Sequence, residues 1–402
     1  MKFYQLRPEE RRKKLIEEGI SLDSIDDEVL KRLDKLSENV IGQLRLPVGI
    51  VQNLVVNGHS YLVPMATEEP SVIAAANHGA RLFRLNGGVV ATSKRDGIYG
   101  QIVLKVGSNF DLNELEKKFP ELITAANQKF ASLVRHGGGL KTISAKLKEN
   151  LLYLKVMVDP AEAMGANKTN SILEYLAAKL EELPMIAEKL FAILSNYPSQ
   201  LTTAKVEIDP KTLGGLKVAK RIELLSKIAV EDPYRAVTNN KGIMNGVDSI
   251  LLATGNDYRA IEAACGVMAN QSGQYRSLSR WHLENGLLKG ELTLPMAIGT
   301  VGGSIFVRKD VQQVYRLLGK VNVATLSEII TAIGLANNLT AILAISTTGI
   351  QAGHMKLQAR NIVAQLNATE KEKKLVLRLM QKKRQYSLED AQKLLERVKG
   401  EE

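Results

Sequence analysis

The stretch of sequence that decides the fold opens with QIVLKV at residues 101–106 and ends near residue 210. The opening segment is rich in aliphatic and β-branched residues and predicts a strand. Asp111 follows, with Glu114 three residues later, which is the spacing of a capping box and indicates the start of a helix. We expect that helix to continue to the triple glycine at 137–139 and to stop there.

Further strands and a second helix complete the pattern. Strands are expected at about 140–148 and 151–158, separated by a short turn, and another at 202–208. A long helix is expected before the last strand, at about 162–194. The resulting order, β-α-β-β-α-β, is typical of a ferredoxin-like domain. We therefore predict an α+β protein in which a small ferredoxin-like domain at 101–210 is inserted into a larger one.

The remainder of the chain predicts a large, helix-rich domain made of residues 1–100 and 211–355. Within it, Pro70 follows Glu69 at the start of a helix whose apolar and small residues recur at helical spacing. The tail at 356–402 contains two amphipathic helices, each preceded by a capping-box pair. Such a pair could form a mobile flap over a site or a docked structural end.

The composition is that of a globular protein with more than one domain. The chain has 402 residues, of which 45% are hydrophobic and 24% charged, and single cores stop growing at about 250–300 residues. Its one cysteine, Cys265, builds no disulfide framework or cysteine-based zinc site and fits a reducing compartment. The N-terminus lacks the apolar core of a secretory signal. We therefore expect a cytoplasmic protein.

The best candidate for a membrane span is the stretch 329–345. It is interrupted by Asn337 and Asn338, whereas a span needs about 20 mostly apolar residues. We therefore interpret it as a buried helix and expect no membrane partner.

The net charge of +11 needs an explanation. Nucleic acid, a small polyanionic ligand such as a nucleotide, or a solvated basic surface would each account for it. Aromatic residues make up 5% of the chain and are not interleaved with basic residues as stacked bases require. Nucleic-acid binding is therefore kept only as a remote alternative, and no nucleic-acid partner is expected.

Four polar residues are candidates for chemistry. Lys241 lies in TNNKGIMNG at 238–246, which we interpret as a loop with little bulk, and Asp257 ends the run ATGND. Glu69 starts a helix, and His354 follows a glycine in AGHM. Taken singly, each has a bland explanation as a solvated lysine, a helix cap or a turn former. The five histidines show no metal-ligand spacing, so no metal site is expected.

Eight short motifs change this interpretation because they occur together and in order. They are ENVIG at 38–42, PMATEEPS at 64–71, AMGAN at 163–167, DPYR at 232–235, NKGIMNG at 240–246, ATGND at 253–257, GTVGG at 299–303 and GHM at 353–355. As a set they closely resemble the soluble, class II form of 3-hydroxy-3-methylglutaryl-coenzyme A (HMG-CoA) reductase. The resemblance covers roughly residues 37–365.

The resemblance implies an oxidoreductase that reduces HMG-CoA to mevalonate and free coenzyme A in two hydride transfers, in the mevalonate route to isoprenoids. It also implies a large domain built round a central helix, a ferredoxin-like domain that binds the nicotinamide cofactor, and a C-terminal flap. Members of the family form homodimers with active sites at the subunit interface. A catabolic enzyme of the same family, which oxidises mevalonate with NAD, stays open as the alternative.

Catalytic roles also follow from the resemblance. Lys241 would polarise the thioester carbonyl and stabilise the developing oxyanion. Glu69 would donate a proton in the aldehyde step, and His354 would protonate the departing thiolate. A helix start favours the ionised form of Glu69, so a donor role needs burial or a proton shared with Asp257. We therefore expect a coupled cluster of Glu69, Asp257 and Lys241.

Further residues would hold the ligands. The substrate-side residues are Arg235, Ser71, Asn245 and Asn337. The cofactor-side residues are Glu162, Met164, Gly165, Asn167 and Asn196. Glu162 stands where the family usually has Asp, Asn337 where it usually has Gln, and Gln358 where it often has a histidine.

The choice of cofactor depends on the helix before the triple glycine. Members that prefer NADH carry an acidic residue there, whereas residues 127–135 read NQKFASLVR, with no carboxylate and with the cations Lys129 and Arg135. Cations suit the 2′-phosphate that distinguishes NADPH. We therefore expect NADPH, with NADH as the alternative.

Overall fold

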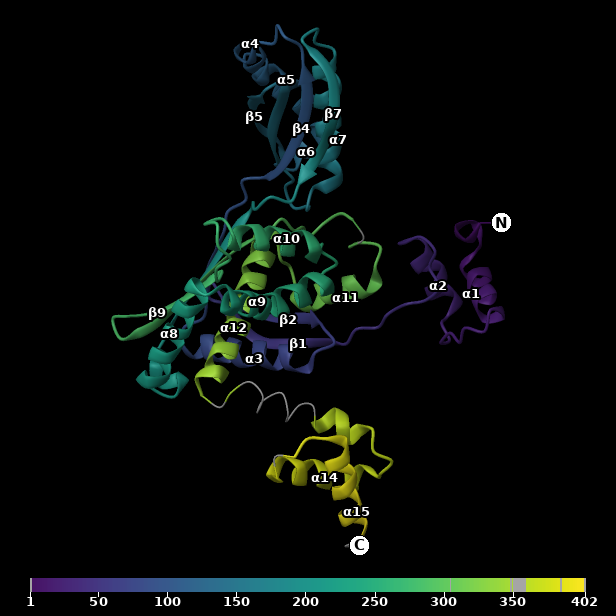
Figure 1. The fold of residues 1–402 in the computed structure, drawn as a ribbon, viewed down its shortest axis with the longest axis vertical. Coiled ribbons are helices and arrows are strands. Elements are labelled where there is room, and N and C mark those ends of the chain that lie inside the picture. Colours follow the sequence, from purple (N-terminus) through teal and green to yellow (C-terminus); the bar gives the residue numbers. More distant parts are fainter. Residues whose placement is uncertain (1, 304, 348, 350–358, 384, 401–402) are drawn as a thin grey trace. The chain divides into compact units, whose positions relative to one another are not determined.

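The computed structural model describes residues 2–303, 305–347, 349, 359–383 and 385–400 (Figure 1). The chain divides into two compact units, Met1–Pro47 and Val48–Glu402.

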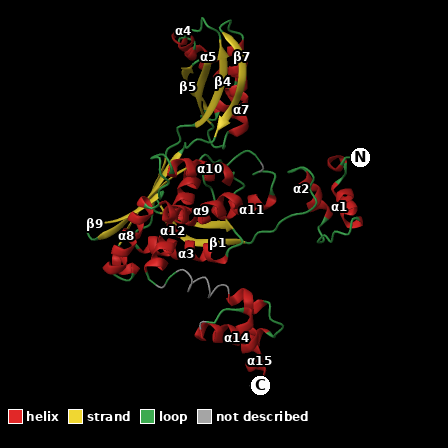
Figure 2. Cartoon of the chain, viewed as in Figure 1, coloured by secondary structure: helices red, strands yellow, loops and turns green. Residues whose placement is uncertain are grey.

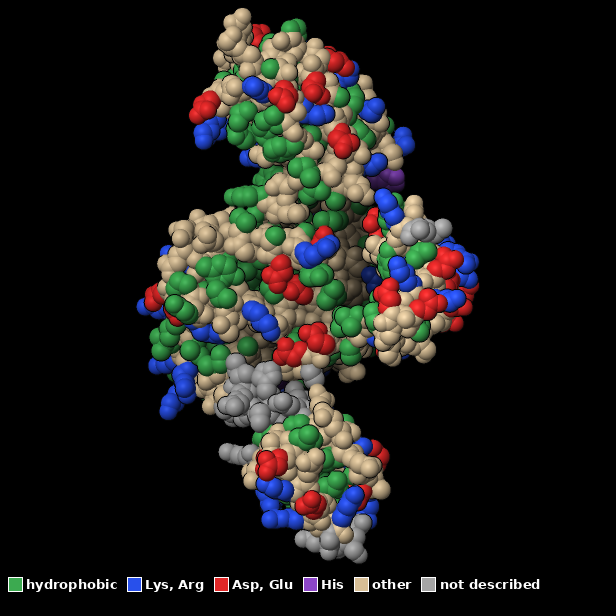
Figure 3. Space-filling view, turned by 45° about the vertical axis from the view of Figure 1, so that its right-hand side comes forward, with side chains coloured by type: hydrophobic (Ala, Val, Ile, Leu, Met, Phe, Trp, Pro, Cys, Tyr) green, Lys and Arg blue, Asp and Glu red, His purple; other side chains and the backbone are tan. Residues whose placement is uncertain are grey.

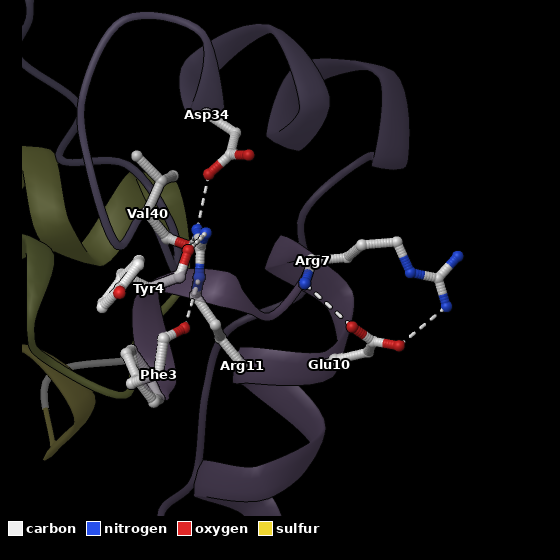
Figure 4. A network of polar contacts seen from close by, with 7 residues as sticks. All are labelled: Phe3, Tyr4, Arg7, Glu10, Arg11, Asp34 and Val40. Carbon is white, nitrogen blue, oxygen red and sulfur yellow. Dashed lines mark hydrogen bonds and ion pairs between the residues drawn. The ribbon is translucent and has the colours of Figure 1, made fainter. Parts of the chain in front are cut away.

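The N-terminal unit is a small helical hairpin held by one buried arginine. The Arg11 side chain is 5% exposed, and its guanidinium lies 2.5 Å from Oδ1 of Asp34 (Figure 4). It also donates to the backbone carbonyls of Phe3, Tyr4 and Val40. The elements of this unit are η1 (Phe3–Gln5), α1 (Pro8–Glu17) and α2 (Asp27–Asp34). A buried charge is stable only with all its partners in place, so Arg11 fixes how these elements meet.

The second unit contains a hairpin and a four-stranded antiparallel sheet, with helices packed against both. The hairpin is β1 (Val48–Val56) and β2 (His59–Ala66). The sheet has the order β3-β8-β10-β9, from β3 (Val90–Ser93), β8 (Leu201–Ile208), β10 (Leu287–Pro295) and β9 (Ser279–Glu284). The helices are α3 (Pro70–Leu85), η2 (Pro210–Leu213), α8 (Leu216–Glu231), α9 (Pro233–Ala253), α10 (Tyr258–Ala269), α11 (Lys309–Leu318) and α12 (Val323–Ser346).

Helix α12 is the centre of this core. It packs against α3, α9, β8 and β10, and most of its side chains are buried. It is the one described helix that is long and apolar enough to cross a membrane, but 72% of its most hydrophobic window is buried inside the protein. The prediction of a buried helix at 329–345 is therefore confirmed, and Asn337 and Asn338 lie inside it.

Glycines let two neighbouring helices approach α12 closely. A Cβ at Gly79 of α3 would lie 2.5 Å from the carbonyl oxygen of Ala336. A Cβ at Gly246 of α9 would lie 3.0 Å from Ile333 and 3.2 Å from Asn337. A side chain has no room at Gly79 and only a tight fit at Gly246, so these glycines allow the close spacing of α3, α9 and α12.

A second antiparallel sheet forms the ferredoxin-like part of the chain, seen at the top of Figure 2. Its strand order is β5-β6-β4-β7, from β5 (Gly139–Lys148), β6 (Leu151–Asp159), β4 (Ile98–Val106) and β7 (Ile186–Ser195). Its helices are α4 (Leu112–Glu116), α5 (Phe119–Lys129), α6 (Ala131–Arg135) and α7 (Ala166–Glu181). The order β-α-β-β-α-β is the predicted one, and a separate hydrophobic core supports it.

Three of the predicted elements are wrong in detail. The single helix expected from Asp111 to the triple glycine is divided into α4, α5 and α6. The long helix expected at 162–194 ends at Glu181, and 186–195 forms the strand β7 along the edge of the sheet. The predicted last strand, at 202–208, pairs instead with β3 and β10 in the other sheet. Charged residues interrupt the apolar residues of β7 at a spacing that resembles that of a helix. The segment forms a strand because it hydrogen-bonds to β4, and this pairing outweighs the local helical pattern.

The C-terminal helices form a third hydrophobic cluster. Residues 359–364 are helical and are followed by α14 (Glu370–Lys383) and α15 (Leu388–Gly400). Both predicted capping boxes are present. Thr369 and Glu372 exchange backbone–side-chain hydrogen bonds at the start of α14, and Ser387 and Asp390 do the same at α15.

Replacement of Gly79 tests the importance of close helix packing. Gly79→Ala should lower the free energy of unfolding by about 1–3 kcal/mol, because the new methyl group meets backbone of α12 that cannot move aside. The matched control is Gly266→Ala in α10, where a Cβ meets nothing within 4 Å and a gain of up to about 1 kcal/mol is expected. Urea unfolding measures both, and equal effects of the two substitutions would contradict the packing argument.

Candidate active site

A pocket of about 470 Å³ lies among α3, α9 and α12. Its polar lining includes Glu69, Ser71, Arg235, Lys241, Asn245 and Asn337, which are six of the residues predicted from the sequence. A larger hollow of about 1100 Å³ belongs to the N-terminal unit and contains none of the predicted site residues. The pocket among the three helices is therefore the candidate active site.

Lys241 lies within α9 and not in the predicted loop. Asp232 caps this helix by accepting hydrogen bonds from the backbone amides of Tyr234 and Arg235. The glycines that suggested a loop are tolerated because one of them, Gly246, packs directly on α12. A helical position holds the lysine more rigidly than a loop would.

Glu69 faces Lys241 across the pocket. Its Oε2 lies 3.7 Å from Nζ of Lys241, and its Oε1 accepts a hydrogen bond of 2.6 Å from the hydroxyl of Ser71. Glu69 occupies the N-cap position of α3, but its side chain makes no capping hydrogen bond. The Glu69 side chain is 35% exposed and that of Lys241 65%, so both groups are open to a ligand.

Asp257 does not join this pair within the single chain. Its carboxylate caps α10 by accepting from the backbone amides of Arg259 and Ala260, and it pairs with the Arg259 guanidinium at 3.2 Å. Neither Lys241 nor Glu69 contacts it among the described residues. The expected cluster of three is therefore a pair in this chain. His354, the fourth predicted catalytic residue, lies outside the described residues.

Two pocket residues have polar atoms without a partner among the described residues. They are Nε of Arg235 and Oδ1 of Asn337. Asn337 is 4% exposed, and burial lowers the pKa of Arg235. Buried polar atoms are normally hydrogen-bonded, so unpaired ones in a pocket indicate groups that await a ligand.

A buried polar network fixes the floor of the pocket. Oδ1 of Asn338 in α12 accepts from the hydroxyl of Ser279 and from the indole N–H of Trp281, both in β9. Its Nδ2 donates to Oδ1 of Asn239 in α9. Because each bond has a direction, this network sets the rotation of α9 and α12 about their axes.

The segments 162–167 and 299–303, which contain two of the eight motifs, lie side by side. The carboxylate of Glu162 accepts from the hydroxyl of Thr300 and from the backbone amide of Val323, the first residue of α12. Gly299 packs directly against the backbone of Met164, where no side chain would fit. The longer glutamate at position 162 therefore links the cofactor-side segment to α12.

The other predicted cofactor residues are accessible. Gly165 has a positive φ of 93° at the N-cap of α7 and supplies no side-chain cap, so the amides that begin this helix stay open. Asn167 and Asn196 are exposed, at the start of α7 and just after β7. Lys129 and Arg135 are exposed at the ends of α5 and α6, and the Lys129 ammonium lies 5.0 Å from the Tyr175 ring centre.

Sequence reasoning missed some of the pocket lining. His78, Asn239 and Asn338 all line the pocket. His78 could have been found from helical periodicity, since it follows Ser71 by seven residues and so lies on the same face of α3. The two asparagines could not, because only the packing of α9 on α12 brings them together.

Two carboxyl groups, Asp248 of α9 and Glu262 of α10, lie close together outside the pocket lining. Burial, followed by a hydrogen bond to Glu262 of α10 and its charge, raises the pKa of Asp248 in α9 to about 8. Burial also raises the pKa of the nearby Cys265 thiol, which makes it unreactive. At neutral pH the folded chain therefore holds a proton on this pair.

Comparisons with known proteins identify the family of the chain. The family model for hydroxymethylglutaryl-coenzyme A reductase matches residues 7–359. The 3-hydroxy-3-methylglutaryl-coenzyme A reductase of Archaeoglobus fulgidus is 36% identical, over 99% of this chain and 94% of that protein. The 3-hydroxy-3-methylglutaryl-coenzyme A reductase structure from Streptococcus pneumoniae matches with a TM-score of 0.77 and 38% identity, over 98% of this chain and 99% of that one.

A second Streptococcus pneumoniae structure, described as the class II enzyme bound to NADPH in open conformations, has a TM-score of 0.76 and 39% identity and covers 96% of this chain and 95% of that one. The fold and the site thus define an oxidoreductase. The chain belongs to the hydroxymethylglutaryl-coenzyme A reductase family.

The Asp248–Glu262 pair predicts a pH-dependent stability. The pKa of Asp248 rises from 3.8 to about 8 on folding, so the folded chain binds a proton that the unfolded chain has released, and stability falls as pH rises from about 4 to 8. Asp248→Asn removes the titrating carboxyl group and with it this dependence of stability on pH. The variant should gain stability relative to the wild type between pH 5 and pH 8.

Denaturant unfolding at a series of pH values measures this difference. Glu262→Gln is the companion variant, since it removes the neighbouring charge and should flatten the same slope. Parallel pH profiles for the wild type and both variants would refute the shared proton.

Proposed function

We propose that this protein reduces HMG-CoA to mevalonate and coenzyme A with NADPH, at the pocket among α3, α9 and α12. The observation that carries the proposal is the Lys241–Glu69 pair, 3.7 Å apart, in a pocket where Nε of Arg235 and Oδ1 of Asn337 have no partner among the described residues. A thioester carbonyl placed between these groups meets a positive charge on one side and a carboxyl group on the other.

Lys241 stabilises the charge that develops on the substrate. Its ammonium group lies at the end of a long side chain on a rigid helix, and it is exposed towards the pocket. When hydride adds to the thioester carbon, the carbonyl oxygen becomes an oxyanion, and a fixed positive charge beside it lowers the barrier. The bound NADPH supplies this hydride.

Glu69 supplies the proton in the second reduction. The hydroxyl of Ser71 and the ammonium of Lys241 hold its two oxygens in different directions. The carboxyl group can therefore deliver a proton to the oxygen that Lys241 stabilises without a change of backbone. For His354 we keep the role implied by the family, protonation of the thiolate that leaves.

The remaining polar residues orient the substrate. Arg235 has an Nε with no partner in the described part of the chain and suits the free carboxylate of the 3-hydroxy acid. Asn337 has a buried unpaired Oδ1 that suits a hydroxyl donor, and Asn245 lines the same pocket. With Ser71, these residues account for the polar groups at the acid end of the substrate.

We assign NADPH to the ferredoxin-like part of the chain. Open amide groups at the start of α7 suit a pyrophosphate, since Gly165 leaves them uncapped. Lys129 and Arg135 are exposed cations that suit a 2′-phosphate. We further propose that residues 1–100 and 211–355 form the large domain, residues 101–210 the small domain, and residues 356–402 a flap. The protein acts as a cytoplasmic homodimer with active sites at the subunit interface.

The alternative functions have less support. Mevalonate oxidation with NAD uses the same site in reverse and differs in cofactor and direction. Nucleic-acid binding would need one basic surface, but the face shown in Figure 3 carries acidic and basic side chains interspersed. It would also leave the Lys241–Glu69 pair without a role.

Loss of the lysine tests the proposed chemistry. Lys241→Ala should lower kcat by about 10²–10³-fold, because the oxyanion loses its stabilising charge. The assay follows the absorbance of NADPH during oxidation by HMG-CoA. Lys220→Ala, an exposed lysine of α8 outside the pocket, is the control and should retain wild-type rates. Full activity in Lys241→Ala would rule out the mechanism.

Two cations test the cofactor preference. The double variant Lys129→Ala/Arg135→Ala should lower kcat/KM for NADPH about tenfold or more and leave NADH nearly unchanged, since hydrogen bonds to a charged phosphate are worth about 1.5–3 kcal/mol. Lys148→Ala, an exposed lysine in β5, serves as the control. Equal losses with both cofactors would show that these residues do not read the 2′-phosphate.

A further inference from the structure

Two short segments connect the ferredoxin-like sheet to the other four-stranded sheet. Residues 94–97 lead from β3 to β4, and residues 196–200 lead back from β7 to β8. Because β3 pairs with β8 and β4 pairs with β7, the two connections run alongside each other. A hydrogen bond of 3.2 Å joins them, from the backbone amide of Gly97 to the side-chain oxygen of Gln200. The two sheets are therefore joined through one paired connection.

Arg95, in the first connection, binds a third segment of the chain. Its Nη1 donates to the backbone carbonyl of Met296 at 2.9 Å, and its Nη2 donates to that of Ile298 at 3.4 Å. The second connection contacts the same segment, because the backbone carbonyl of Gln200 accepts from the amide of Met296 at 3.1 Å. Segment 296–298 is therefore fixed from both connections.

The Arg95 guanidinium is a partly buried charge that serves backbone groups. Among the described residues it makes no ion pair, and its buried Nε has no partner. Burial lowers the pKa of Arg95 to about 10, while the charges of three carboxylates, led by Glu162, act in the opposite direction. The group is therefore charged at neutral pH. The planar fork of an arginine can bind two carbonyls at once, which a lysine cannot do in the same geometry.

The residues after this segment lie against the part of the chain that we assign to NADPH. Residues 299–301 run beside 162–164, with a hydrogen bond of 2.9 Å from the amide of Thr300 to the carbonyl of Glu162. At the closest approach of the two segments no side chain would fit between them. Close-packed backbone transmits displacement. A shift of 296–298 would therefore also move the open amides at the start of α7.

We propose that Arg95 is a positioning residue for the nicotinamide cofactor. Through 296–298 it holds 162–164 and the start of α7 in the geometry that receives the pyrophosphate, and it contacts neither cofactor nor substrate itself. The inference rests on the proposed function, because it takes the start of α7 as the cofactor site. NADPH and NADH share the pyrophosphate, so Arg95 acts on both alike, in contrast to Lys129 and Arg135.

The test measures cofactor binding without turnover. Arg95→Met keeps most of the bulk and removes both hydrogen bonds, so it should raise Kd for NADPH and for NADH about tenfold each, which corresponds to about 1.4 kcal/mol. The readout is the fluorescence of the bound reduced cofactor, titrated in the absence of HMG-CoA. Arg95→Lys keeps the charge but has no fork, and its Kd values should lie between those of the wild type and Arg95→Met.

Turnover separates cofactor placement from a general loosening of the fold. In Arg95→Met, KM for NADPH should rise about as much as Kd. KM for HMG-CoA should stay within twofold of the wild type, because the substrate pocket lies among α3, α9 and α12. Arg221→Met, an exposed arginine of α8, is the matched control and should bind both cofactors as the wild type does. Arg95→Gln repeats the measurement if the methionine variant folds poorly.

Three results would overturn the role of Arg95. The first is an unchanged Kd for both cofactors. The second is a KM for HMG-CoA that rises as much as KM for NADPH, which would indicate a general structural effect. The third is a loss confined to NADPH, which would indicate contact with the 2′-phosphate.

The same measurements keep the two proposals distinct. Turnover of HMG-CoA by the wild type, with unchanged cofactor binding in Arg95→Met, would overturn the role of Arg95 alone. A wild type that neither binds the cofactors nor turns over HMG-CoA would overturn the proposed function and this inference with it.

Discussion

The close approach of α3 and α9 to α12 is the constraint on which the rest of the structure depends. Gly79 and Gly246 bring the two helices against the central one: a Cβ at Gly79 would collide with Ala336, and one at Gly246 would press on Ile333 and Asn337. The pocket lies among these three helices, with Glu69 and Ser71 on α3, Lys241 on α9 and Asn337 on α12. The helix packing that forms the core therefore also sets the positions of the pocket residues.

The polar side chains of the pocket fall into two groups. Some hold the helices together, and others have atoms without a partner among the described residues. Asn239 and Asn338 hydrogen-bond to each other and to β9, and these bonds fix the orientation of α9 and α12 about their axes. Arg235 and Asn337 retain unpaired atoms in the pocket. An unpaired buried group costs about 1–3 kcal/mol, which is tolerable where a substrate restores the bond. The unpaired atoms thus lie in the pocket that we propose as the substrate site.

Local signals in the sequence were good predictors where structure is local. Both C-terminal capping boxes formed as expected, because their partners lie three residues apart. The buried helix at 329–345 is also confirmed, and the order β-α-β-β-α-β holds with 186–195 in place of 202–208 as its last strand. The assignments failed where neighbours decide: β7 looks helical by itself, and the glycines around Lys241 look like a loop until α12 is packed against them.

The sequence by itself was enough to identify the family, the class of fold and most of the polar residues that line the pocket, because ordered motifs and helical periodicity can be recognised directly in it. The resemblance also led us to expect Glu69 beside Lys241. Tertiary structure alone decided that Asp257 caps α10 in this chain and that His78 opens into the same pocket. These outcomes depend on contacts between residues far apart in sequence. Such contacts are set by how α3, α9 and α12 pack, which no local pattern encodes.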